Sequence, residues 1–317
     1  SDTINCIQSI AQLSGLGSST GTDFEYLWSS FDGNPISNQT QLDASVDIEG
    51  VYQLLVTDNS NGCSDSDIVI IAIDTITPTL SGQVPDILNC SVTEAILSIN
   101  SSVINDVSYD WTTSSGNIIS GSNTANPIVD APGIYELQFV NLVNGCEAQE
   151  QITVQQDINQ PTIDAGSGGT ITCVDLVFTA QATSSTNSGQ SNISWTTPNG
   201  TIDSGAGTLN PIFSDQGLYI VEIIDPINDC IDVDTVEVFL NQNYPVISPL
   251  SPLTLDCNNV VVTIDGSSTN LEPQYQLQWT TAGGNIVSGG TTLSPVVDLA
   301  GQYDLTIVDV DNGCVSS

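Results

Sequence analysis

Apolar and polar residues alternate along most of this chain. The segment 275–279 has the sequence YQLQW and the segment 303–307 has the sequence YDLTI, each with polar residues between the apolar ones. A period of two predicts β-strands that bury one face. The alternating runs are 24–28, 107–111 and 275–279 before a tryptophan, 52–56, 135–139, 219–223 and 303–307 after a glycine, and 152–154 and 260–264 after a cysteine. Since no helical stripe of useful length interrupts them, the pattern predicts an all-β protein.

The same pattern returns four times, with a period of 83 or 84 residues. Each unit has a first cysteine, a tryptophan 35 residues before a second cysteine, and a tyrosine 11 residues before that second cysteine. The first cysteines are Cys6, Cys90, Cys173 and Cys257, and the second are Cys63, Cys146, Cys230 and Cys314. The aromatic positions are Trp28, Trp111, Trp195 and Trp279, and Tyr52, Tyr135, Tyr219 and Tyr303. Repetition at a fixed period predicts tandem structural units.

About seven short strands fit into each unit, which predicts a seven-stranded β-sandwich. Pro78, Pro161 and Pro245 each lie 15 residues after a second cysteine and mark the linkers. The expected units are repeat 1 (1–76, first strand truncated), repeat 2 (77–159), repeat 3 (160–243) and repeat 4 (244–317, last strand truncated). We expect the aromatic residues to fill the cores of these units, which would form an elongated rod. Because the sequence starts with Ser and has no signal peptide, we expect it to be a piece of a longer chain.

The unit G-x-Y-x-L-x-V-x-D-x-x-N-G-C, with W-T-T upstream, resembles the PKD/Ig-like repeats of giant surface adhesins of Bacteroidota. The resemblance covers nearly the whole chain, although the W-D-F-G-D-G motif of PKD repeats is missing. It implies type IX secretion, a location outside the cell or on its surface, and a role in cell adhesion.

Composition excludes several functions. The chain has 37 carboxylates and no Lys, Arg or His, so its formal net charge is −37. Nucleophile systems that need His and Schiff-base chemistry that needs Lys are therefore absent, and we expect no enzyme and no cofactor. Nucleic acid and anionic membranes are excluded as partners because cations are needed to bind them. With 39% hydrophobic residues, the chain can nevertheless bury cores.

Eight regularly placed cysteines in an extracellular protein predict disulfides. The default pairing lies within each unit: Cys6–Cys63, Cys90–Cys146, Cys173–Cys230 and Cys257–Cys314. In an alternating sandwich, however, the two cysteines of a unit fall at opposite ends. The alternative joins consecutive units by Cys6–Cys146, Cys90–Cys230 and Cys173–Cys314, leaving Cys63 and Cys257 to bond units outside the sequence. Strand direction favours the second pattern, but the sequence leaves both open.

Three motifs suggest other sites. Asp309 and Asp311 in the segment DVDNGC resemble the start of a calcium loop. The equivalent segments are DNSNGC, NLVNGC and DPINDC, in which the asparagine two residues before the cysteine is the constant part, so we interpret it as a hairpin turn. Asp203-Ser204-Gly205 resembles an aspartic protease motif, but the equivalents of Asp203 are Ile119 and Val287, which indicates a strand. The tryptophans could stack on sugars, but their place in alternating runs favours core packing.

We therefore expect a stiff, disulfide-locked and protease-resistant shaft of a secreted adhesin or extracellular filament, used for attachment to surfaces, other cells or prey. The alternative is an array that binds glycans or cells through loops such as 181–192. The expected partners are neighbouring repeats of the same long chain and other copies in a homo-oligomeric filament, which salt or Ca²⁺ would screen. The target itself would be bound elsewhere in the protein.

Overall fold

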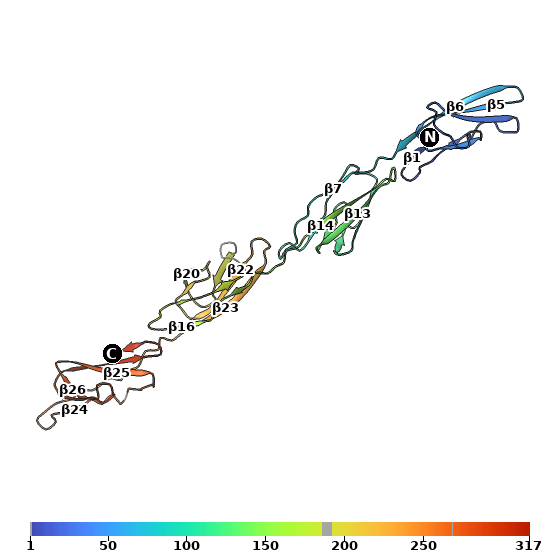
Figure 1. Ribbon diagram of the computed structural model, residues 1–317. Helices are drawn as coiled ribbons and strands as arrows, with labels where there is room; N and C mark the ends of the chain where they lie inside the picture. The colour runs from blue at the N-terminus through green and yellow to red at the C-terminus, as the bar shows by residue number, and fades with distance from the viewer. Residues whose placement is uncertain (1, 186–191, 268) are drawn as a thin grey trace. The chain divides into compact units, whose positions relative to one another are not determined.

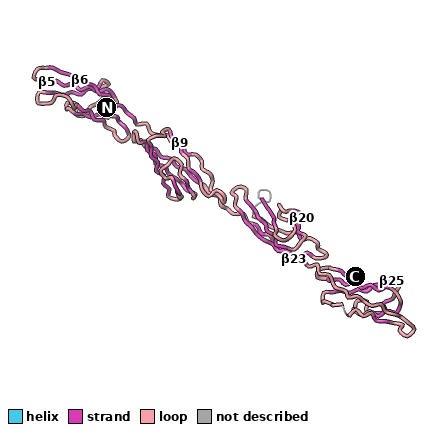
Figure 2. Tube along the Cα trace, turned by 180° about the vertical axis from the view of Figure 1, so that it is seen from behind, coloured by secondary structure: helices cyan, strands magenta, loops and turns pink. Residues whose placement is uncertain are grey.

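The computed structural model describes residues 2–185, 192–267 and 269–317. Throughout these ranges the chain consists of strands, turns and loops, without a helix (Figure 2). Accordingly, the described ranges contain no helix that could cross a membrane. The predicted all-β class is confirmed. Two compact units divide the chain, one spanning 1–158 and the other 159–317.

The first unit contains repeats 1 and 2, whose strands are labelled in Figure 1 where space allows. Repeat 1 has the strands β1 (Thr3–Asn5), β2 (Ala11–Ser14), β3 (Phe24–Ser30), β4 (Asp43–Val46), β5 (Gly50–Asp58) and β6 (Cys63–Asp74). Repeat 2 has β7 (Leu80–Gly82), β8 (Ala95–Ile96), β9 (Ile99–Ser101), β10 (Val107–Thr113), β11 (Ile118–Ser120), β12 (Ile128–Val129), β13 (Gly133–Asn141) and β14 (Glu147–Val154).

The second unit contains repeats 3 and 4. Repeat 3 has β15 (Ile163–Asp164), β16 (Gly169–Ile171), β17 (Phe178–Thr179), β18 (Thr183–Ser184), β19 (Asn192–Thr196), β20 (Ile202–Ser204), β21 (Ile212–Phe213), β22 (Gly217–Ile224) and β23 (Ile231–Leu240). Repeat 4 has β24 (Val262–Thr263), β25 (Tyr275–Ala282), β26 (Asn285–Ser288), β27 (Val296–Leu299), β28 (Gln302–Asp309) and β29 (Val315–Ser316). Many strands have only two or three residues, so six to nine are assigned per repeat in the described ranges.

Each repeat is built from two main sheets. In repeat 3 these are β16-β23-β22-β19 and β17-β21-β20, and in repeat 4 they are β25-β28-β29 and β24-β27-β26. The predicted strands before each tryptophan and after each glycine pair with one another, as β10 does with β13 in antiparallel register. Tandem β-sandwich repeats are therefore confirmed as the fold class.

One edge of the sandwich departs from simple alternation. The first strand of the main sheet runs parallel to the last one, as β1 does beside β6 with Asn5 opposite Asp74. The same parallel pairing joins β16 to β23 in repeat 3. Because parallel neighbours end at the same edge of a sheet, the residue after β1 lies beside the end of β6, where the chain leaves the repeat.

Four separate cores match the four repeats, and each includes one of the repeated tryptophans. All four tryptophans are at most 4% exposed. Each indole Nε1–H donates to a backbone carbonyl 13 or 14 residues later, at Leu42, Thr124, Thr208 or Thr292. Burial with a satisfied polar tip leaves no indole face on which a sugar could stack.

The repeated tyrosines anchor the start of a long central strand. Their hydroxyls donate to the carbonyl four residues earlier, at Ile48, Ala131, Asp215 and Leu299. Tyr52, Tyr135 and Tyr219 are fully buried, whereas Tyr303 is only partly buried. In repeat 4 the strand that follows Cys314, β29, has two residues. A groove of about 470 Å³ lies beside Tyr303 and is lined also by Leu253 and Leu255.

Burial raises the pKa of Tyr135 and Tyr219, although backbone hydrogen bonds to Asn117 and Thr201 offset part of the effect. A pKa that is higher in the folded state stabilises the fold below the unfolded value, which is about 10 for tyrosine. That stability is lost as the pH rises through the folded pKa. Since the chain has no Lys or Arg, no basic side chain contributes to this pH dependence.

We therefore expect the free energy of unfolding to fall as the pH rises from about 9 to 11. The measurement is guanidinium unfolding at several pH values, with Cys63 and Cys257 alkylated so that no thiol can attack the disulfides. The variant Tyr135→Phe/Tyr219→Phe should start less stable at pH 8 but lose less stability up to pH 11. An equal loss in both proteins would contradict the assignment.

Of two local expectations, the strand at 260–264 was largely wrong and the hairpin strand at Asp203 is confirmed. The run Val260, Val262 and Ile264 was expected to form a strand, but only Val262–Thr263 does and Val260 is exposed. The reason is the turn before it, in which the N–H of Asp256 donates to the carbonyl of Asn259 and delays the start of the strand. Asp203-Ser204-Gly205 forms the end of β20 and its turn, with the Asp203 carboxylate accepting from the Ser214 hydroxyl at 2.8 Å.

Candidate functional site: the disulfide joints between repeats

The first cysteine of a repeat follows its first edge strand. In repeat 1, Cys6 comes directly after β1, at the edge where β6 ends. Cys63 is the first residue of β6, which is 12 residues long. At about 3.3 Å per residue, roughly 36 Å of strand separates the two ends, whereas the Cα atoms in a disulfide lie about 4.4–6.8 Å apart. The two cysteines of repeat 1 therefore cannot bond to each other.

A capped turn presents each first cysteine. The residue before it is Asn5, Asn89, Thr172 or Asp256. In every case a side-chain oxygen of this residue accepts the N–H groups two and three residues later. The N–H groups of Asn259 and Asn258 accordingly lower the pKa of Asp256. This is an Asx or Ser/Thr turn, which holds the cysteine at the tip of a rigid loop.

The second cysteine ends a tight hairpin turn between the last two long strands. In the turn after β28, the N–H of Gly313 donates to the carbonyl of Asp309 at 2.7 Å. The Asp309 carboxylate accepts the N–H of Asp311, and the Asn312 side-chain oxygen accepts the N–H of Cys314. Asp58 and Asp225 accept equivalent N–H groups, so an aspartate caps the turn in three of the four copies. The side-chain and backbone groups of Ser60 lower the pKa of Asp58.

The two kinds of turn meet where one repeat joins the next. Cys6 is bonded to Cys146 and Cys173 to Cys314, each with Cα atoms 5.0 Å apart. Both bonds connect consecutive repeats inside one compact unit, and neither cysteine pair belongs to a single repeat. Cys90 and Cys230 are also disulfide-bonded. Cys63 and Cys257 are free and exposed.

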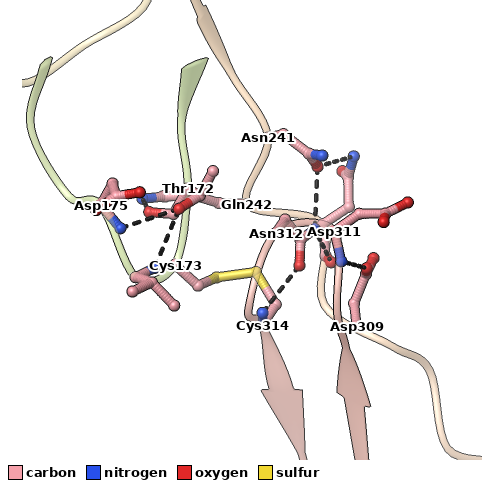
Figure 3. The surroundings of a disulfide bond; sticks show 11 residues. Thr172, Cys173, Asp175, Asn241, Gln242, Asp309, Asp311, Asn312 and Cys314 are labelled. Carbon is pink, nitrogen blue, oxygen red and sulfur yellow. Dashed lines mark hydrogen bonds between the residues drawn. A yellow bond between two sulfur atoms is a disulfide. The ribbon is translucent and has the colours of Figure 1, made fainter. Parts of the chain in front are cut away.

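Hydrogen bonds surround each of the two disulfides. The backbone N–H of Cys6 donates to the carbonyl of Asn144, and that of Cys173 donates to the carbonyl of Asn312, both at 3.0 Å. Figure 3 shows the second joint, where the side chain of Asn312 lies next to the disulfide and contacts the linker residue Asn241. Gln242 of the same linker donates to the carbonyl of Thr172.

The constant asparagine is the residue whose function the sequence did not reveal. We expected the Asn-Gly pair to form the hairpin turn. The positive φ angle of that turn lies at the second residue of the pair, which is Gly62, Gly145, Asp229 or Gly313, and not at the asparagine. Asn144 is only 2% exposed, and its Nδ2 donates to the Asp74 carboxylate and the Ile76 carbonyl in the linker before its repeat. Asn312 makes the same two contacts with Asn241 and Asn243, and Asn228 donates to the carbonyl of Asn159.

Asn61 provides an internal contrast. Its side chain is exposed, and its Nδ2 donates to Asp58 of its own turn. The turn itself still forms, so the asparagine is not required to reach a linker for the hairpin to close. The signal that could have revealed the second function is the conservation of Asn228 among the copies, because its neighbour is Asp229 rather than glycine and an Asn-Gly turn therefore does not explain it.

The calcium interpretation of Asp309 and Asp311 finds little in this geometry. Asp309 is buried and its carboxylate is used by the turn, while Asp311 is exposed. Across the described ranges no group of three or more acidic or sulfur side chains is placed to hold a metal ion. The loop 181–192, the example for glycan binding, has its residues 186–191 outside the described ranges.

Comparison with known proteins found similar chains among solved structures. No family model and no curated protein matches the chain. Among solved structures, the human desmocollin-1 ectodomain covers 93% of this chain and 70% of its own, with 12% identity and a TM-score of 0.30. Immunoglobulin domains 1–5 of Sidekick-1 cover 97% of this chain and 75% of their own (10% identity, TM-score 0.30), and the titin I-band fragment I67–I69 covers 70% and 89% (11% identity, TM-score 0.34). At these scores the likeness carries no argument about function. The assignment of the fold rests on the chain's own strands and cores, which form tandem β-sandwich repeats with disulfide joints.

Proposed function

We propose that this chain is a load-bearing spacer in a secreted adhesin or extracellular filament. The observation that supports it most is the joint between repeats 1 and 2. There the Cys6–Cys146 disulfide connects the two repeats, and the buried Asn144 of repeat 2 donates hydrogen bonds to Asp74 and Ile76 at the end of repeat 1. Two domains joined only by a linker are expected to move relative to each other. Here a disulfide and side-chain hydrogen bonds connect the two repeats in addition to the linker, and they restrict that motion. The shaft would hold a binding region, located elsewhere in the protein, away from the cell that exports it.

The composition fits an exposed, oxidising environment. Disulfides persist outside the cell, and a chain without Lys or Arg has no site for a trypsin-like protease. Formal charge of one sign over all repeats keeps separate shafts apart in low salt, and salt or Ca²⁺ would allow them to associate into a filament. Secretion by the type IX system, as the sequence resemblance implies, belongs to the same proposal.

We further propose that Cys90 pairs with Cys230 and that the exposed Cys63 and Cys257 take bonds from further repeats. Periodicity supports this, because Cys90 and Cys230 hold the same positions as the bonded cysteines in the other two joints. Peptide mapping without reduction, using an Asp-directed protease, should recover a Cys90–Cys230 peptide. A Cys90–Cys146 or Cys173–Cys230 peptide would contradict the proposal.

Single-molecule pulling from the two ends of the chain tests the mechanical function. Each of the two described disulfides closes a segment of about 140 residues, which cannot extend while the bond is intact. The proposed Cys90–Cys230 bond would overlap both segments, so each segment extends fully, by roughly 500 Å at about 3.5 Å per residue, only when all of these bonds are open. We expect the oxidised chain to remain short at forces that unfold the sandwiches, and a thiol reductant to release the extra length stepwise as the bonds open. An oxidised chain that extends as far as the reduced one would disprove the load-bearing role.

A further inference from the structure

One side chain of the first joint packs directly on a glycine of the next repeat. A methyl group at Gly145 would lie 2.0 Å from Cγ1 of Ile7, the residue that follows Cys6. In the joint between repeats 3 and 4, a methyl group at Gly313 would lie 2.1 Å from Cγ2 of Val174, the residue that follows Cys173. In both joints a β-branched apolar residue after the first cysteine thus occupies the space that a side chain before the second cysteine would need.

One other copy of the turn shows that the glycine is not required by the turn alone. Asp229 holds the glycine position in repeat 3 and adopts the same backbone conformation, with φ of 56° beside 68° at Gly145. Its N–H still donates to the carbonyl of Asp225 and closes the turn. In the sequence, the first cysteine of the preceding repeat is followed not by Ile or Val but by Ser91. A larger residue at one position thus accompanies a smaller residue at the other.

We propose that these two positions form a matched pair that determines which repeats can be neighbours. Glycine before the second cysteine selects a repeat with Ile or Val after its first cysteine, and aspartate selects one with a small polar residue. The turn 58–63 carries Gly62, which has open space around it. It is therefore an acceptor for a repeat of this type whose first cysteine is followed by Ile or Val. This inference rests on the proposed shaft, because it states how the order of repeats in the shaft is chosen.

The test is a double-mutant cycle at the first joint in the full chain, with Gly145→Asp, Ile7→Ser and both together. The readout is the equilibrium in which the Cys6–Cys146 disulfide and two molecules of glutathione give two protein thiols and glutathione disulfide. We expect Gly145→Asp to shift this equilibrium toward the thiols about tenfold. Ile7→Ser alone should shift it less than threefold, and the double variant should return to within threefold of the unchanged chain.

Two controls separate the pair from other effects. Gly62→Asp places the same residue in the same backbone conformation, at a position where no other side chain is in contact. Its effect on the free energy of unfolding measures the conformational cost of the substitution alone. It should leave the Cys6–Cys146 equilibrium unchanged. The Cys173–Cys314 bond serves as an internal reference in every sample. A Gly145→Asp effect that is equally large with Ser at position 7, or no effect at all, would overturn the matched pair. The load-bearing proposal would survive either result, because the pulling experiment tests it separately.

The acceptor function of the turn 58–63 is tested by lengthening the full chain. A second copy of residues 160–251 placed before Ser1 supplies a repeat with Cys173 and Val174 in register, because Ser1 corresponds to position 252 in the repeat. Cys63 should then form a disulfide with the added Cys173. Gly62→Asp should weaken this bond about tenfold, and Val174→Ser in the added repeat should restore it. A Cys63 that remains a free thiol in the lengthened chain, or a bond indifferent to these substitutions, would refute the inference.

Discussion

Removing the Cys6–Cys146 bond by Cys6→Ser/Cys146→Ser should lower the free energy of unfolding of the first unit by about 5 kcal/mol. The bond closes a segment of 140 residues, and the chain-entropy model gives this value for a loop of that size. The loss should appear as unfolding of repeats 1 and 2 at a lower guanidinium concentration. Hydrogen exchange of the backbone amides in β5 and β13 monitors this transition. The strands of the second unit should keep their protection, because Cys173–Cys314 is intact.

Cys63→Ser is the matched control for this experiment. It removes a sulfur that is exposed and unbonded, so the expected change is within about 0.5 kcal/mol. Added to the Cys6→Ser/Cys146→Ser variant, it also removes a free thiol that could otherwise form a new disulfide. A loss of less than about 1 kcal/mol in the double-serine variant would mean that the other contacts of the joint carry its stability.

Asn144→Asp should destabilise the first unit by about 3 kcal/mol at neutral pH. The substitution removes a buried donor that serves the Asp74 carboxylate and the Ile76 carbonyl, and places a second carboxylate beside the first. No cation in the chain can compensate, since it has no Lys, Arg or His. Urea unfolding of the variant and the unchanged chain measures the difference.

Position 61 offers the matched control, because Asn61 occupies the same turn but is exposed. Asn61→Asp should change stability by no more than about 0.5 kcal/mol. A second control is acidity: the carboxylate in the Asn144→Asp variant is disfavoured when charged, so its folded pKa is raised. Its destabilisation should therefore shrink as the pH falls below the folded pKa and the group becomes neutral. Equal losses at positions 61 and 144 would show that the linker contacts do not matter.

Much of the fold follows from local patterns. The alternating runs before Trp111 and after Gly133 correspond to β10 and β13, and the spacing of cysteines, tryptophans and tyrosines matches four separate cores. These features could be predicted because a strand's buried face shows directly as a period of two in its sequence. The run at Val260 failed because a turn capped by Asp256 competes for the same residues, and both signals are short.

The disulfides show where local patterns are insufficient. Periodicity identifies Cys6, Cys63 and Cys146 as important, but both Cys63 and Cys146 stand at equivalent places and either could be the partner of Cys6. The choice depends on which end of the sandwich each cysteine occupies, and that depends on the parallel pairing of β1 with β6. Parallel pairing leaves no mark in the hydrophobic pattern, since a short edge strand looks the same in either direction.

The sequence by itself thus determined the period of the repeats, their strands, the residues of their cores and the turns that carry the cysteines, because all of these depend on neighbours close in the chain. Only the tertiary structure decided that Cys6 meets Cys146, that Asn144 reaches the linker at Asp74 and Ile76, and that Ile7 packs on Gly145. Those contacts join residues about 70 to 140 positions apart, and they form because folding brings the end of one sandwich against the start of the next.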